Sequence, residues 1–158
     1  MHKPKLSPRR ISRSLAVQGI YSFQTNPKSV SEIEDFLQST NEEIFARANY
    51  DLLHYLLDMS TNNFEQSLAL YTGYSDRPMN EIQTTEKAIL VIASVELKHN
   101  LEVPAPVIIN EAIELAKIYG GEDSFKFING LVDKLAMNLR HSEMEHARNN
   151  RRKAANHS

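Results

Sequence analysis

The chain has 158 residues, of which 41% are hydrophobic, and this length and composition suit one globular domain with an apolar core. It contains no cysteine, which excludes disulfides and thiolate metal sites. The net charge of −2 hides an asymmetry, because residues 1–31 carry six bases and no acid, whereas residues 32–139 carry eighteen acids and seven bases. A cationic segment on an acidic body attracts polyanions, and nucleic acid is the first candidate.

The distribution of apolar residues predicts an all-α fold. Apolar residues recur at spacings of three and four nearly throughout, and five glycines are few for a β-rich or doubly wound fold. No stretch approaches the ~20 apolar residues of a membrane span, and the basic start lacks the apolar run of a signal peptide. We therefore expect a soluble, cytoplasmic protein.

The first half of the chain divides into an arm and several helices. Residues 1–8 contain two prolines and are expected to form a flexible basic arm. A helix over 9–24 should end before Asn26-Pro27. A short helix to about residue 38 and a long helix over 42–71, with a bend near 61–63, should follow. Two pairs have the spacing of a capping box and would start these helices: Ser31 with Glu34, and Thr40 with Glu43.

The second half begins with a loop over 73–80, in which Pro78 opens a single turn. Three helices are predicted after it: one capped by Thr84 or Thr85 and ending near Asn100, one with Pro106 in its first turn, and one capped by Asp123 or Ser124 and ending near Arg140. The middle one should end at Gly120-Gly121, where a glycine can adopt the left-handed conformation.

These elements make a compact bundle of about six or seven helices in a single domain over 9–140. Its halves would span about 9–75 and 80–140. Residues 141–158 are polar and net positive, and we expect them to form a disordered tail.

One face of the first helix is a candidate for binding RNA. At ~100° per residue one side of this helix should face the core. That side holds Leu15, Ala16, Gly19 and Phe23. The opposite side holds Arg10, Arg13, Val17, Tyr21 and Gln24. Arginine forks bind phosphates and an exposed tyrosine stacks on an unpaired base, so this side could bind RNA. A solvated cationic face with one surface tyrosine is the alternative.

The start of the last helix offers a second candidate surface. Lys126 points away from the apolar stripe of this helix, and Phe127 lies on its flank. The helix N-terminus could hold a phosphate, although Asp123 would compete for the same amides as a cap. The structural alternative is a well-capped helix whose phenylalanines fill the core.

No pattern of catalytic, cofactor-binding or metal-binding residues stands out. The glycine pair matches no phosphate-binding loop, and His141 and His146 fall in the expected tail without metal-ligand spacing. We therefore predict no catalytic residue, no cofactor and no metal. Glu96 shares a side with Ile89 and Ala93, which indicates a partly buried, paired carboxylate.

Several segments together resemble the NusB family. Residues 109–120, INEAIELAKIYG, are similar to its "INEAIELAK.FG" signature, and residues 122–134, EDSFKFINGLVDK, to its "EDSHKFVNGVLDK" continuation. The opening from Arg9 to Gln24 and the segments 86–90 and 96–97 fit as well. Residues 26–80 match only in length and helical pattern.

The resemblance implies two packed three-helix subdomains and a non-enzymatic transcription antitermination factor. Such a factor binds boxA RNA of ribosomal RNA transcripts together with NusE, a protein of the small ribosomal subunit, in an RNA polymerase complex with other Nus factors. Family members occur as monomers and dimers, so a homodimer stays open. By position, the implied RNA-binding residues are Arg9, Arg10, Arg13, Gln18, Tyr21, Asp123, Lys126, Phe127 and Asn129. Glu86 falls on the implied NusE-facing surface.

The chain departs from the family pattern at five positions: Ile11, Ser14, Val91, Val95 and Phe125. Ile11 replaces a frequent base, which could weaken RNA binding, and Val91 and Val95 alter the helix expected to face NusE. An RNA-modifying enzyme is a second hypothesis, because NusB-like domains also precede ribosomal RNA methyltransferases, but this chain has no room for such a domain. A third is a protein-only helical adaptor without RNA binding.

Overall fold

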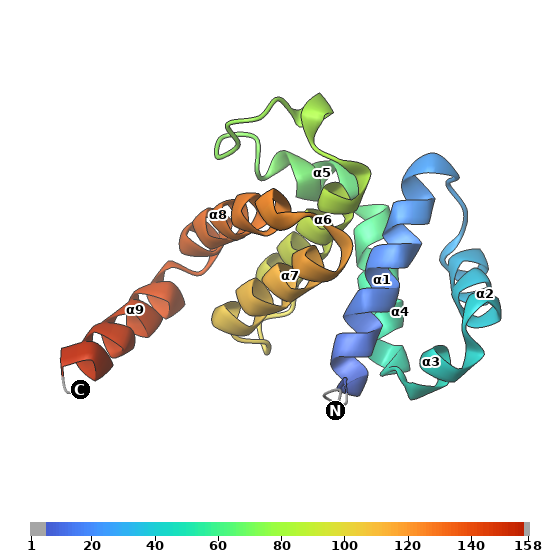
Figure 1. The fold of residues 1–158 in the computed structure, drawn as a ribbon, viewed down its shortest axis with the longest axis horizontal. Coiled ribbons are helices and arrows are strands. Elements are labelled where there is room, and N and C mark those ends of the chain that lie inside the picture. Colours follow the sequence, from blue (N-terminus) through green and yellow to red (C-terminus); the bar gives the residue numbers. More distant parts are fainter. Residues whose placement is uncertain (1–5, 157–158) are drawn as a thin grey trace.

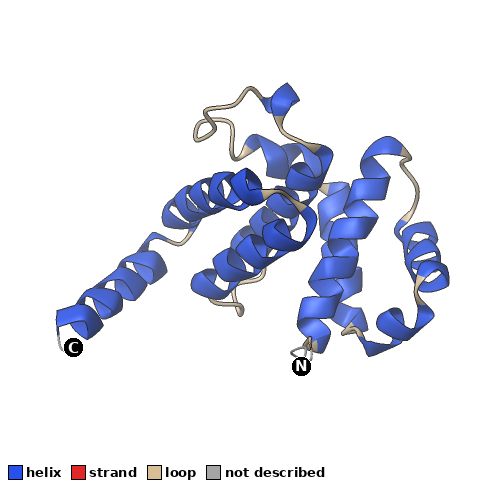
Figure 2. Ribbon diagram, in the orientation of Figure 1, coloured by secondary structure: helices blue, strands red, loops and turns tan. Residues whose placement is uncertain are grey.

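The computed structural model describes residues 6–156, and within them it contains nine α-helices, one 3-10 turn and no strand (Figures 1 and 2). The all-α prediction is confirmed. The helices are α1 Pro8–Thr25, α2 Val30–Thr40, α3 Glu42–Arg47, α4 Tyr50–Asn62, α5 Phe64–Ala69, α6 Thr84–His99, α7 Ala105–Tyr119, α8 Glu122–Leu139 and α9 His141–Asn156, with the 3-10 turn at Met79–Glu81. None of these helices is long and apolar enough to cross a membrane.

Helices α1 and α6 form the centre of the molecule. Helix α1 packs against α4 on one side and α6 on the other, and α6 also contacts α5, α7 and α8 (Figure 1). The sequence of α6 is apolar around most of its circumference, and residues 88–97 are all buried. A helix that is hydrophobic all round belongs inside a fold, so α6 is the helix around which the others assemble.

Helix α1 begins where its sequence predicts. Ser7 accepts a hydrogen bond from the Arg10 N–H at 3.1 Å, and Pro8 occupies the first turn, where its missing N–H costs nothing. Residues 1–5 of the expected flexible arm lie outside the described residues. The cap at Ser7 fixes where the helix starts and so places Arg9 and Arg10 in its first turn.

The predicted long helix over 42–71 is three helices in the structure. The first break is at Asn49, whose side chain caps α4 by accepting the Leu52 N–H at 3.1 Å. The Asn49 backbone also binds the start of α1, donating to the Pro8 carbonyl at 3.2 Å and accepting from the Ser12 hydroxyl at 2.6 Å. These bonds join residues far apart in the sequence, so periodicity within residues 42–71 could not predict this break. The second break, at Asn63, falls where a bend was expected.

Several predicted helix ends are displaced by one or two residues. Ser29 caps α2 and Asn41 caps α3, in place of Ser31 and Thr40, because each accepts the N–H three residues onward. The preceding residues Gln83 and Gly121 are the N-caps of α6 and α8, so neither Asp123 nor Ser124 is a cap.

The expectation of a left-handed glycine after α7 was wrong. Gly120 has φ −113° and ψ 176°, an extended conformation, and no described residue has a positive φ. A glycine is required at position 120 because there is no room for a side chain. A Cβ there would lie 2.6 Å from the Ser124 Oγ and 2.9 Å from the Ala116 carbonyl oxygen. The missing side chain therefore allows α7 and α8 to meet in a tight turn.

Residues 141–156 form helix α9, which differs from the expected disordered tail. Arg140 and Met144 are buried at its base, although most of the helix is polar and exposed. Composition alone predicted disorder because an isolated polar helix of this length is marginal in water. Contacts at its first turn supply the missing stability. Residues 157–158 of the predicted tail lie outside the described residues.

Candidate nucleic-acid interface

The two arginines at the start of α1 differ in exposure and in whether they pair with a carboxylate. Arg9 is exposed. Arg10 is partly exposed and binds Glu111 of α7 through two hydrogen bonds, Nε to Oε2 at 3.2 Å and Nη2 to Oε1 at 3.1 Å. The hydrogen bonds and the charge of Glu111 raise the pKa of Arg10. Arg9 is therefore available to a phosphate directly, whereas Arg10 shares its guanidinium with a carboxylate.

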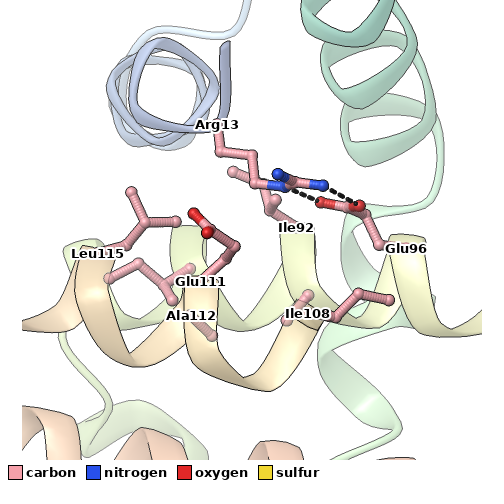
Figure 3. Close-up of a pocket in the computed structure, with 9 residues that line it drawn as sticks. Arg13, Ile92, Glu96, Ile108, Glu111, Ala112 and Leu115 are labelled. Carbon is pink, nitrogen blue, oxygen red and sulfur yellow. Dashed lines mark hydrogen bonds and ion pairs between the residues drawn. The ribbon is translucent and has the colours of Figure 1, made fainter. Parts of the chain in front are cut away.

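Arg13 is buried, which corrects the expectation that it lies on the exposed stripe. Only 4% of the residue is accessible, and its guanidinium binds Glu96 of α6 through two hydrogen bonds, at 2.7 Å and 3.0 Å (Figure 3). Burial acts to lower the pKa of Arg13, but the hydrogen bonds and the charge of Glu96 outweigh it and the pKa is raised. No RNA group can reach this side chain while the pair is intact.

Val17, predicted on the same stripe, is also buried. The reason is that α1 is covered on two sides, by α4 and by α6, so its buried arc is wider than one amphipathic stripe. Glu96 shares a side of α6 with Ile89 and Ala93, which predicted a paired carboxylate that is at least partly buried, and the structure confirms this. Arg13 as its partner carried no recognisable signal in the sequence.

The other end of the stripe is open to solvent around Tyr21, which is 47% exposed. Tyr21 and Gln18 line a groove of about 510 Å³ together with Phe36 of α2 and Tyr119 of α7. Tyr119 holds this groove together, because its hydroxyl accepts a hydrogen bond from the Gln18 amide at 2.9 Å. A groove with exposed rings and amide groups can accept an unpaired base by stacking and hydrogen bonding.

The beginning of α8 displays the second predicted surface. Asp123, Lys126 and Asn129 are exposed, whereas Phe127 is partly buried. The Arg77 guanidinium lies over the Phe127 ring, 3.7 Å from its centroid. One face of this ring is therefore already covered by a cation, so Tyr21 is the more accessible stacking partner of the two.

Glu86, predicted to face the NusE partner, lies inside the protein at 1% exposure. Its carboxylate accepts hydrogen bonds from the Arg77 guanidinium at 3.0 Å, the Ser124 hydroxyl at 2.8 Å and the Gln83 N–H at 3.1 Å. Glu86 therefore ties the loop before α6 to the start of α8. Its burial leaves it unable to contact a partner directly.

The two surfaces are neighbours in the fold. Tyr119 ends α7 one turn before α8 begins, and its hydroxyl also lies 2.5 Å from the Ser14 hydroxyl of α1. The groove of α1 and the start of α8 thus meet at Tyr119, which sequence reasoning did not select because the contact spans more than a hundred residues. Within residues 6–156, no group of three or more His, Asp or Glu side chains is placed to hold a metal ion.

Comparisons with known proteins give one consistent match. The model of the NusB family matches residues 10–137. The transcription antitermination protein NusB of Aromatoleum aromaticum is 42% identical over 140 residues, covering 89% of this chain and 95% of that protein. The NusB protein of Burkholderia lata is 40% identical over 145 residues, covering 92% and 99%. Among solved structures, T. maritima NusB superposes with a TM-score of 0.66 and 25% identity, covering 84% of this chain and 92% of that one.

Proposed function

Because this chain belongs to the NusB family, we propose that it binds boxA RNA of ribosomal RNA transcripts together with NusE, in an RNA polymerase antitermination complex with other Nus factors. Its broader role is transcription antitermination, the function that its relatives carry in their names. We propose that it acts as a transcription factor and not as an enzyme, in line with the names of these relatives. A factor of this kind acts where transcripts are made, which we place in the cytoplasm.

The observation that carries the proposal is the open groove at Tyr21, which lies on the same helix as the exposed Arg9 and the partly exposed Arg10. Tyr21, Gln18 and Arg10 lie on one side of α1, and eleven residues from Arg10 to Tyr21 span about 16 Å along the axis. This length allows several nucleotides to lie along the helix, with phosphates at Arg9 and Arg10 and a base on the Tyr21 ring.

The exposed residues at the start of α8 extend this surface. Lys126 supplies a cation, and Asn129 supplies an amide that can read a base edge. Asp123 has no capping role, so its carboxylate is available to accept a hydrogen bond from a base amino group. Phe127 contributes through its edge, since Arg77 covers one face of the ring.

We assign Arg13 and Glu86 indirect roles. Arg13 holds α1 against α6 and so sets the position of the groove. Glu86 holds Arg77 and Ser124, and through them the start of α8. A NusE contact at this end of the molecule would then depend on the exposed neighbours of Glu86 rather than on its carboxylate.

The test is equilibrium binding of boxA RNA and a scrambled RNA, each with and without NusE, over a series of salt concentrations. If about four phosphates are contacted, log Kobs should fall with log salt at a slope near −3. The Arg9→Ala variant should bind more weakly and reduce the steepness of that slope by about 0.7. Binding of boxA RNA no better than scrambled RNA under every condition would contradict the proposal.

A protein-only adaptor is the second candidate, and one observation favours it. Two of the three arginines at the start of α1 are neutralised by Glu111 and Glu96, which reduces the positive potential there. Under this alternative the chain would bind NusE normally but retain no RNA at any salt concentration. The same titration therefore separates the two candidates.

A further inference from the structure

Helix α9 lies outside the segment that the NusB family model matches, which ends at residue 137. It extends from the end of α8 at the side of the molecule away from α1 (Figure 1). The surface on α1 and α8 described above does not include it. Its charge and its attachment to the body both indicate a separate role.

The base of α9 is firmly attached. The buried Arg140 guanidinium donates hydrogen bonds to the carbonyls of Glu96, Leu97 and Asn100 at the end of α6, at 2.9 to 3.0 Å. Glu143 accepts the Ala105 N–H of α7 at 2.6 Å. These bonds, with the buried side chain of Met144, fix the direction in which α9 leaves the body.

The remaining turns of α9 are cationic and exposed. Residues 146–156 carry four bases and no acid. Arg148, Arg151 and Arg152 share one face at spacings of three and four residues. Arg148 pairs with Asp133 of α8 at 3.4 Å, and no ion pair among the described residues involves Arg151, Arg152 or Lys153.

The chemistry of this segment fits phosphates better than a protein surface. Residues 146–156 contain no apolar side chain larger than alanine, so the segment lacks the aromatic or aliphatic anchor on which protein interfaces depend. Phosphate binding requires only accessible cations, and arginine binds phosphate through two hydrogen bonds. Lys153 lies in the last turn of α9, where the helix dipole favours a cation.

We propose that the cationic half of α9 is a second contact for single-stranded RNA, which binds backbone phosphates without regard to sequence and engages transcripts that continue beyond the boxA element. The proposal rests on the RNA-binding function proposed above. Along α8 and α9, the 26 residues from Lys126 to Arg152 span at most about 39 Å. A short RNA held at α1 and the start of α8 would not reach this segment, whereas a longer one would.

The experiment compares a short boxA RNA with the same RNA carrying an oligouridine extension at its 5′ or 3′ end. In the triple variant Arg151→Ala, Arg152→Ala, Lys153→Ala, affinity for the short RNA should be unchanged, and affinity for at least one extended RNA should fall. Loss of three phosphate contacts should make the fall of log Kobs with log salt less steep by about 2 for that RNA. The ratio of wild-type to variant affinity should therefore shrink about sixteen-fold between 0.05 and 0.2 M salt. Alanine is a good helix former, so α9 should persist.

Two control variants define the interpretation. A variant with alanine at the exposed cations Arg47, Lys98 and Lys134 removes the same charge elsewhere and should bind extended RNA like the wild type. The Arg151→Lys, Arg152→Lys variant keeps the charge and should retain most of the affinity.

Three outcomes would overturn the proposal. Equal binding of extended RNA by the wild type and the α9 triple variant would exclude an RNA contact and leave an acidic protein as the partner. An equal loss in the control triple variant would show a non-specific charge effect. If the wild type bound neither RNA, both this proposal and the proposed function would fail. If the wild type bound the short RNA but the α9 triple variant bound extended RNA equally well, only this proposal would fail and the proposed function would stand.

Discussion

The buried pair of Arg13 and Glu96 gives the sharpest prediction. Arg13→Ala leaves the Glu96 carboxylate buried at 1% exposure without its partner. Breaking a buried pair in this way costs about 3–5 kcal/mol, whereas replacing both partners by apolar residues of similar size is close to neutral. We therefore expect Arg13→Ala to lower the free energy of unfolding by about that amount, and Arg13→Met with Glu96→Leu to change it far less.

Chemical denaturation of both variants measures these free energies, and RNA titration of the double variant measures the function. The double variant should bind boxA RNA like the wild type, because Arg13 does not reach the surface and apolar side chains of similar size keep α1 packed against α6. Arg9→Ala is the matched control, since an exposed arginine should leave stability within about 0.5 kcal/mol while weakening RNA binding. The reasoning is refuted if Arg13→Ala costs less than about 1 kcal/mol, or if the double variant loses as much RNA affinity as Arg9→Ala.

Three further substitutions test the packing. Gly19→Ala should destabilise the fold by about 1–3 kcal/mol in thermal unfolding, because the new Cβ would lie 2.8 Å from side-chain atoms of both Ile33 and Leu57. Gly130→Ala meets nothing within 4 Å in the middle of α8 and should stabilise it by about 0.5–1 kcal/mol, with a higher Tm as the readout. Arg140→Ala should cost at least about 1.5–3 kcal/mol in denaturant unfolding and speed amide exchange in α9; unchanged exchange there would contradict the anchoring role.

The helices that the sequence predicts best are those defined by their own residues. Helix α1 was expected over 9–24 and spans Pro8–Thr25, and α6, α7 and α8 begin and end within a few residues of their predicted bounds. Apolar periodicity, proline positions and capping side chains are local signals, so one sequence suffices for them.

The features that the sequence did not predict depend on contacts between distant segments. The break at Asn49 is fixed by hydrogen bonds to the start of α1. Helix α9 is held in place by Arg140, which binds backbone carbonyls at the end of α6. Arg13 is the clearest case in the candidate site. The sequence placed Arg13 and Arg10 on the same side of α1 and so predicted that both bind RNA. Only the packing of α6 against α1 shows that Arg13 is buried and Arg10 is accessible.

The exposed ring of Tyr21 is the central element of the proposed RNA-binding groove, so its removal is the most direct measurement. Titration of boxA RNA against Tyr21→Ala should show a loss of about 1–3 kcal/mol in binding free energy with little change in stability. Tyr50→Ala, at a similarly exposed tyrosine on α4, should bind like the wild type. Equal boxA affinity in the wild type and Tyr21→Ala would contradict the account.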